Sequence, residues 1–294
     1  SEGGAPLIEA VANDAAGGLP GRVIPFALHH TASTGIDVWL AALCYGAAGI
    51  TVLTTKADAP QYGQALDTQM QVAQTVLDGL GYAGPHFQLL RVASAQELAV
   101  AMQHAPRGEV PAQSATFNLA QDKRNTLDYT LDHLLRHARQ QPETVALPVG
   151  APFGAIVVNK QTCSLCMSCV GACPTSAVMD TPNAPQLRFV EQNCVQCGLC
   201  ATTCPENAIT LVPRMAFGEL RKQTVVLNES QPFHCIRCSK PFGTVHMIEN
   251  MLARLSGHSA FAGNLERLKM CGDCRVIDMM QPEGELSVPL RRPR

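Results

Sequence analysis

Charged and aromatic residues are scarce in this chain of 294 residues, at 16% and 5% of the sequence, and the net charge is only −2. Basic residues are in modest surplus in the last third, but no lysine–arginine stripe with interleaved aromatic residues occurs, so we expect no nucleic-acid binding. A glycine-rich phosphate loop, a flavin fingerprint and a nucleophile–base spacing are also missing, which argues against a catalytic reaction of its own. The hydrophobic fraction of 46% predicts a globular protein of two or three domains.

Long apolar runs are absent as well. The most apolar stretch, residues 36–53, is about as long as a membrane span, but Asp37 interrupts its start, and Gly46 and Gly49 divide it into a helix and a strand. We therefore expect no membrane span. No basic segment followed by an apolar run opens the sequence, which favours a cytoplasmic protein. The chain starts at Ser1 with a helical pattern where an α/β domain would start with a strand, which leaves open a fragment of a longer protein.

The sequence is, however, rich in cysteine, with thirteen residues. Eight of them form two copies of the spacing C-x2-C-x2-C-x3-C-P, which is the ligand pattern of bacterial ferredoxins with two clusters. The first copy is Cys163, Cys166, Cys169 and Cys173, and the second is Cys194, Cys197, Cys200 and Cys204. The pattern predicts two [4Fe–4S] clusters, and its specificity disfavours disulfides or zinc knuckles at these residues. Cluster ligands must stay reduced, which again favours the cytoplasm.

The expected ligand sets cross between the two copies. Three cysteines at intervals of three on one loop reach only three corners of a cubane, and in this motif the cysteine before proline ligates the other cluster. The first cluster is therefore assigned to Cys163, Cys166, Cys169 and Cys204. The second cluster is assigned to Cys194, Cys197, Cys200 and Cys173.

Residues around the cysteines repeat in register with them. The apolar run 156–158 precedes the first motif as 187–190 precedes the second, and residues 174–178 align with residues 205–209. Each half is therefore expected to be a short strand, a cluster loop, a helical turn opened by proline and a return strand. Residues 180–186, with two prolines, are expected to form the turn between the halves.

The N-terminal part alternates strand-like and helix-like segments. We expect strands at 23–28, 49–53 and 87–92, with helices after Ile36, over 64–80 and through Glu97. Repeated βα units predict a parallel sheet with helices on both faces, here a flavodoxin-like open sheet. The fold class expected for the whole chain is thus α/β plus α+β in several domains, with this sheet followed by a two-cluster bacterial ferredoxin fold and a small helical zinc-knuckle module.

Several motifs of this N-terminal part resemble the delta subunit of methyl-viologen-reducing hydrogenase. They are Thr34-Gly35-Ile36-Asp37, the run 41–53 and Gly79-Leu80-Gly81-Tyr82. The resemblance implies docking on an electron-transfer complex. That family holds a [2Fe–2S] cluster with cysteines at the strand ends, whereas this chain has residues 28–30 (Leu-His-His) and 53–56 (Leu-Thr-Thr-Lys) there, so we expect that cluster to be absent.

Three further side chains of this part could carry chemistry. His29 and His30 lie after an expected strand, where an open α/β sheet presents ligands, but ordinary loop polar groups are the favoured interpretation. Cys44 falls among apolar residues of an expected helix and is interpreted as a small buried hydrophobe.

The expected domains are 1–105 for the α/β part, 106–150 for a connector, 151–213 for the ferredoxin, 214–282 for a metal-binding module and 283–294 for a basic tail. The connector contains an amphipathic helix over residues 122–140. Its basic and histidine residues, His133 included, are expected to be solvated. The tail, with Arg291, Arg292 and Arg294, is expected to be a solvated terminus.

Four more cysteines form two Cys-x2-Cys pairs in the C-terminal module: Cys235, Cys238, Cys271 and Cys274. Four thiolates suit one tetrahedral ion, and zinc is favoured over mononuclear iron or a third cluster. Because four cysteines leave no open position, the expected role is structural. Two helices are expected between the pairs, and His234, His246 and His258 are alternative ligands.

The whole order of segments resembles the C-terminal part of a polyferredoxin of bacterial redox gene clusters, on residues 193–200 and 233–235. The resemblance implies electron relay with redox enzyme subunits as partners, such as those of a formate dehydrogenase or hydrogenase. We expect a non-catalytic carrier or a subunit of an oxidoreductase complex, and the sparsely charged ferredoxin segment suggests one embedded in a larger assembly. The alternative is a maturation or scaffold protein for a metalloenzyme, with clusters as structural staples.

Overall fold

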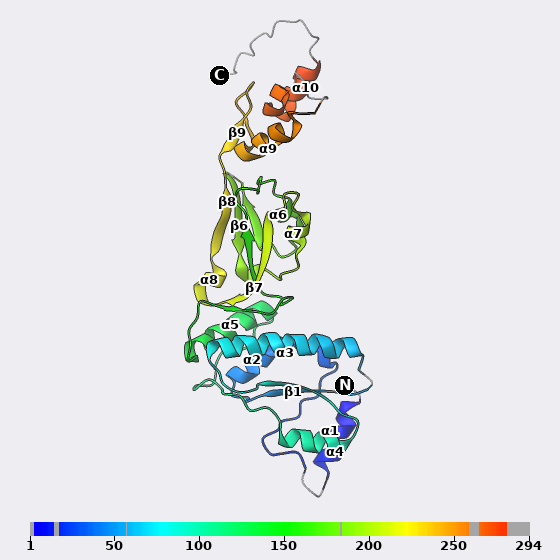
Figure 1. Ribbon diagram of the computed structural model, residues 1–294. Helices are drawn as coiled ribbons and strands as arrows, with labels where there is room; N and C mark the ends of the chain where they lie inside the picture. Colours follow the sequence, from blue (N-terminus) through cyan, green and yellow to red (C-terminus); the bar gives the residue numbers. More distant parts are fainter. Residues whose placement is uncertain (1–2, 15–17, 57, 183, 259–264, 281–294) are drawn as a thin grey trace. The chain divides into compact units, whose positions relative to one another are not determined.

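The structure is a computed structural model that describes residues 3–14, 18–56, 58–182, 184–258 and 265–280 (Figure 1). The expected basic tail, 283–294, lies outside the described residues. The chain divides into two units. Ser1–Gly154 and Pro213–Lys222 form the first unit, and Ala155–Val212 and Gln223–Arg294 form the second. Among the described helices, none is long and apolar enough to cross a membrane.

The first unit is a small α/β structure. Its elements are α1 (Gly4–Ala12), η1 (Thr31–Ser33), α2 (Ile36–Cys44), β1 (Ile50–Thr54), α3 (Pro60–Leu80), β2 (Phe87–Arg91), α4 (Ala95–Gln103), α5 (Lys123–His137), β3 (Thr144–Ala146) and α8 (Gly218–Lys222). Proline at the first position begins α3, and Gly81, at φ 83°, ends it. Both are the residues that these helix positions favour.

Strands β1 and β2 pair in parallel, from Ile50 opposite Phe87 to Thr54 opposite Arg91. One face of the pair packs Val52 and Leu89 with α2 and α3, while the other packs Leu53 and Leu90 with α1 and α4. Figure 1 shows these helices on the two sides of β1. The expected helices on both faces of a parallel sheet are thus present.

The expected flavodoxin-like open sheet is not found, because the parallel sheet of the described residues has only two strands. The expected strand over residues 23–28 is wrong: this segment has no strand partner, and Ile24 and Phe26 are 88% and 80% exposed. Pro25 in its middle lacks the N–H that a ladder needs, which confines proline to strand edges and bulges.

Helices α2, α3 and α5 share the largest apolar core of this unit. Leu40 and Leu43 of α2, Leu77 of α3 and Leu131 and Leu134 of α5 are all almost fully buried in it. Burying each such side chain contributes roughly 1.5–3 kcal/mol. The amphipathic helix expected in the connector therefore lies within this core. The helix spans Lys123–His137 and is thus slightly shorter than the expected range of 122–140. Asp122 precedes it and caps it by accepting a hydrogen bond from the Arg124 amide.

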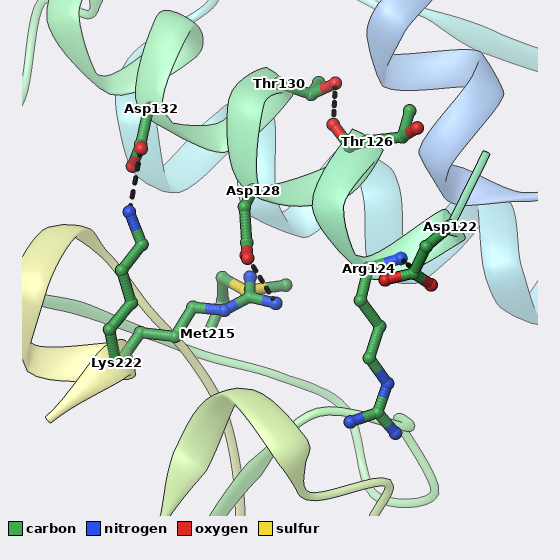
Figure 2. A network of polar contacts seen from close by, with 9 residues as sticks. Asp122, Arg124, Thr126, Asp128, Thr130, Asp132, Met215 and Lys222 are labelled. Atoms are coloured by element: carbon green, nitrogen blue, oxygen red, sulfur yellow. Dashed lines mark hydrogen bonds and ion pairs between the residues drawn. The ribbon is translucent and has the colours of Figure 1, made fainter. Parts of the chain in front are cut away.

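The polar side of α5 binds α8 through two ion pairs of very different burial (Figure 2). Asp128 and Arg221 lie 3.0 Å apart with side chains only 8% and 6% exposed. Asp132 and Lys222 also lie 3.0 Å apart, but both are about one-third exposed. The first pair is therefore part of the interior of this unit, and the second lies at its surface.

The second unit contains the repeated motifs. Its elements are β4 (Gly154–Val158), α6 (Ser168–Ala172), β5 (Val178–Thr181), β6 (Ala184–Val190), η2 (Glu191–Asn193), α7 (Leu199–Thr203), β7 (Ile209–Ala216), β8 (Thr224–Glu229), β9 (Pro232–His234), β10 (Pro241–Thr244), α9 (Val245–Leu255), η4 (Leu265–Lys269) and α10 (Gly272–Met280). Strands β4 and β7 each have an end in the first unit, where β3 pairs antiparallel with residues 214–216.

The strand–loop–helix–strand order expected of each half is confirmed. The amide of Asn159, directly after β4, donates to Ala208 O at 2.8 Å, and the amide of Val190, the last residue of β6, donates to Ala177 O at 2.9 Å. These donors and acceptors occupy matching places in the two halves, so each half closes on the other. The turn between them is shorter than expected, because β5 continues to Thr181 and β6 begins at Ala184.

Strand β8, which was not predicted from the sequence, pairs antiparallel with β6 and completes the sheet β5-β6-β8. Its inner side chain Asn228 is 6% exposed and donates to the carbonyl of Cys163 at 3.5 Å. Residues 224–229 thus support the first cysteine loop. The domain boundaries expected around this segment remain predictions.

Candidate metal centres

The two cysteine loops of the repeat have the same backbone. Leu165 and Met167 adopt positive φ values of 56° and 62° in the first loop, as Gln196 and Gly198 do at 52° and 79° in the second. Residues with positive φ turn consecutive backbone N–H groups toward one concave side, which is how nests for Fe–S clusters and anions form. Three of the four are not glycine, and such strain is expected where function demands it.

Short helices hold the third cysteine of each loop. Cys169 lies in the first turn of α6 and Cys200 in the first turn of α7, and both are buried. The helices end at Ala172 and Thr203, directly before Cys173-Pro174 and Cys204-Pro205, because proline cannot continue the hydrogen-bond ladder. The fourth cysteine of each copy is thereby turned away from its own loop.

Each loop surrounds a cavity that four cysteines line. The first cavity has Cys163, Cys166, Cys169 and Cys204 on its wall. The second has Cys173, Cys194, Cys197 and Cys200. These are the two crossed sets that the spacing predicts. The assignment of individual ligands stays a prediction, and the arrangement of the cavities supports it.

The cavities are similar in size and apolar in character. The space among their lining residues, including the part open to solvent, is about 330 Å³ and 320 Å³. Leu187 and Ile209 line the first, and Ile156, Val178 and Leu211 line the second. Two spaces of one size, each with four sulfurs and apolar walls, fit two copies of the same sulfur-ligated group.

Burial and neighbouring sulfurs oppose ionisation of the third cysteine of each loop, and positive charge in the cavity would offset that effect. Burial, and then the neighbouring Cys163 and Cys166, raise the pKa of Cys169 to about 12. Burial also raises the pKa of Cys200, as does the nearby Cys194. Four thiolates in such a space repel one another without positive charge between them, and iron supplies that charge in a cluster.

Side chains next to the cysteines offer hydrogen bonds to their sulfurs. In the first loop the Ser168 hydroxyl lies 3.4 Å from Cys166 Sγ. In the second, Gln196 Nε2 donates to Cys194 Sγ at 3.4 Å and also to the carbonyl of Ala155 at 2.9 Å. Hydrogen bonds to the sulfurs are one of the factors that set cluster potentials. Comparing Leu165 with Gln196 at matching positions of the repeat would have identified this difference from sequence.

The C-terminal cysteines also come together. The sulfurs of Cys235, Cys238, Cys271 and Cys274 all lie within 4.8 Å of one another. Cys238 Sγ and Cys271 Sγ are 3.7 Å apart, too far for a disulfide bond of about 2.05 Å. A tetrahedron of Zn–S bonds of about 2.3 Å has edges of about 3.8 Å, so the spacing fits one tetrahedral ion.

Turns and helix ends position these four sulfurs. The hairpin of β9 and β10 holds Cys235 and Cys238, and Ser239 takes a positive φ of 61° directly after the pair. Helix α10 begins after Cys271 and carries Cys274 in its first turn. The first helix expected between the pairs is confirmed as α9, while the second is the short 3-10 helix η4.

Electrostatics favour a cation here too. Burial opposes ionisation of Cys235, but backbone N–H groups of Cys271, Cys238 and Arg237 outweigh it and lower the pKa of this thiol to about 6. Burial and the three neighbouring sulfurs raise the pKa of Cys274. The thiolate of Cys235 is thus favoured, and a metal ion among the four sulfurs would offset the effects that oppose ionisation of Cys274.

The other candidate residues, His29, His30, Cys44 and His133, belong to the first unit. His30 caps η1, its Nδ1 accepting from the Ala32 amide at 3.1 Å, and its ring contacts Tyr62 edge-on, while His29 is exposed. Cys44 is fully buried, burial raises its pKa to about 12, and its interpretation as a small buried hydrophobe is confirmed. His133, expected to be solvated, is instead buried, with Nε2 2.9 Å from Gln113 O.

Comparison with known proteins identifies the central segment. Residues 162–209 match the family model of the 4Fe-4S dicluster domain. These residues therefore form a ferredoxin-type domain that binds [4Fe–4S] clusters. No curated protein matches the chain. The resemblances to a polyferredoxin and to the hydrogenase delta subunit thus stay predictions.

Proposed function

We propose that the chain is an electron-transfer protein that relays electrons through two [4Fe–4S] clusters within a redox enzyme complex. The observation that carries the proposal is the pair of similar cavities, each lined by four cysteines from both copies of the motif. When bound, cubane clusters supply one-electron chemistry over a wide range of potentials. The dicluster domain supports iron–sulfur electron transfer independently.

The residues of the domain suit this task in three ways. The crossed cysteine sets hold two sites in one small, interlocked fold. Apolar residues such as Ile156, Leu187 and Leu211 line the cavities beside the sulfurs. Cys166 and Cys197, one in each loop, are exposed, so each site has one edge that a redox partner could approach.

The proposed partners are subunits of a dehydrogenase or hydrogenase. The domain has few charged residues, which suits permanent assembly better than electrostatic steering between diffusing proteins. We propose zinc for the four C-terminal cysteines, with mononuclear iron as the alternative. With all four positions taken by sulfur, the ion would stabilise the fold of its module and take no part in chemistry.

A potentiometric EPR titration of the anaerobically purified full chain tests the proposal. Two [4Fe–4S]⁺ signals that interact magnetically and appear at accessible potentials are expected of a relay. Iron bound in full but EPR-silent under strong reductant would contradict it. That result would favour the alternative, a maturation or scaffold protein in which the clusters are structural.

A further inference from the structure

The two halves of the dicluster domain differ in one charged residue at matching positions. Cys204-Pro205 is followed by Glu206, whereas Cys173-Pro174 is followed by Thr175. Glu206 lines the first cavity and Thr175 lines the second. Cysteines aside, Glu206 is the one ionisable side chain among the described residues that line either cavity. The repeat is therefore symmetric in its ligands and asymmetric in its charge.

The carboxylate of Glu206 is well placed to act on the first site. Its side chain is only 14% exposed, so bulk water screens it weakly. Its ion-pair partner is Arg254 on α9, whose side chain is 65% exposed. The guanidinium is thus largely hydrated and offsets the charge of the carboxylate only in part.

The two sites also differ in the burial of their cysteines, which affects their reduction potentials. Cys163 and Cys169 are both buried in the first set, whereas Cys200 alone is buried in the second. Reduction adds one negative charge to a cluster, and both a nearby carboxylate and loss of solvent make that charge less favourable. Hydrogen bonds to sulfur are present at both sites: Ser168 and the Ala208 amide serve the first set, and Gln196 and Thr175 serve the second.

We propose that Glu206 holds the reduction potential of the first site below that of the second, and that Arg254 of the C-terminal module limits the difference. Glu206 acts only through its charge, which sets the order in which the two sites accept electrons. This inference rests on the proposed function. An electron shared by the two sites would reside mainly at the second, formed by Cys173, Cys194, Cys197 and Cys200.

Potentiometric EPR titration of the anaerobic full chain tests the inference, with iron content measured for every variant. In Glu206→Gln the lower of the two midpoint potentials is expected to rise while the higher one stays, so that the gap narrows. Arg254→Gln is expected to lower the lower midpoint further and widen the gap. Thr175→Glu, the reciprocal change, is expected to lower the higher midpoint.

Glu206→Thr is a second variant, in case glutamine disturbs the loop, because threonine is the residue of the matching position. A rise of the higher midpoint in the Glu206 variants, or no shift of either midpoint, would overturn the inference. A wild-type chain with no reducible cluster would instead refute the proposed function, so the two failures are distinguishable.

Discussion

Cys204 lines the cavity of Cys163 although the two residues belong to different copies of the repeated motif. The helix α7 ends before Cys204, and Pro205 directs the chain away from the second loop. Cys173 has the reciprocal place in the second cavity. Each site therefore depends on a residue that lies far from its own loop in sequence.

This arrangement predicts which site each substitution damages. Cys204→Ala is expected to lose the iron of the first cluster and retain that of the second, so that about half of the cluster iron remains. Cys173→Ala is expected to do the reverse. Iron and sulfide analysis, together with EPR of the remaining cluster, measures both. Full iron content in Cys204→Ala would contradict the crossed assignment.

Cys44→Ala provides the control for cysteine replacement. Cys44 is buried in the apolar core of the first unit, and its Sγ lies 3.7 Å from the carbonyl of Thr130. Its replacement leaves a small cavity and lowers stability modestly, but the iron content is expected to equal that of the wild type. Loss of iron in this variant would show that cysteine replacement acts through general misfolding.

The pair of Asp128 and Arg221 predicts a large effect of one substitution on stability. Arg221→Gln removes the guanidinium that lies 3.0 Å from the buried carboxylate of Asp128, which is expected to cost about 3–5 kcal/mol. Lys222→Gln is the matched control, because its pair with Asp132 is partly exposed and contributes less than about 1 kcal/mol. Urea unfolding followed by fluorescence of Trp39, the single tryptophan, measures both. Equal losses in the two variants would contradict the difference in burial.

His133 predicts a dependence of stability on pH. Burial, aided by the charges of His137 and Arg136, lowers its pKa below 6.5, although the carbonyl of Gln113 acts in the opposite direction. The unfolded chain therefore binds more protons than the folded chain once the pH falls below about 6.5. Neutral His133 therefore contributes fully to the free energy of unfolding above about pH 6.5, and this contribution is lost as the pH decreases.

His133→Gln keeps a donor for the Gln113 carbonyl and removes the titration. The free energy of unfolding, from urea titrations at pH 7.5 and pH 6, is expected to fall more in the wild type than in this variant. A decrease of the same size in both proteins would assign the pH dependence to other groups.

The cysteine spacing predicted the candidate sites because thiolate geometry is strict. Four sulfurs must reach the corners of a cubane or a tetrahedron, and the intervals between cysteines encode that requirement directly. The repeated residues 174–178 and 205–209 also predicted both halves of the dicluster domain correctly. Local signals of this kind need no knowledge of distant partners.

Features that depend on distant partners were harder to predict. Residues 23–28 have the apolar content of a strand, but a strand exists only where another edge pairs with it, and Pro25 removes a donor. Strand β8 is the opposite case, because residues 224–229 find the free edge of β6. The contact of Glu206 with Arg254 likewise joins residues far apart in sequence.

The four C-terminal cysteines give the last prediction, which concerns the metal itself. Metal analysis of the purified chain is expected to find one zinc ion per chain in addition to the cluster iron. Cys271→Ser is expected to abolish this zinc, because three thiolates and a hydroxyl form a weaker site. Hydrogen exchange is then expected to accelerate in residues 232–258 and 265–280, since Cys271 immediately precedes α10 and the ion joins that helix to the β9–β10 hairpin.

His246→Gln is the matched control, because His246 lies on α9 near Asn250 and is not among the four clustered groups. Retention of zinc by Cys271→Ser together with its loss from His246→Gln would make the histidine a ligand. A ninth iron per chain in place of zinc, beyond the eight of two clusters, would identify mononuclear iron.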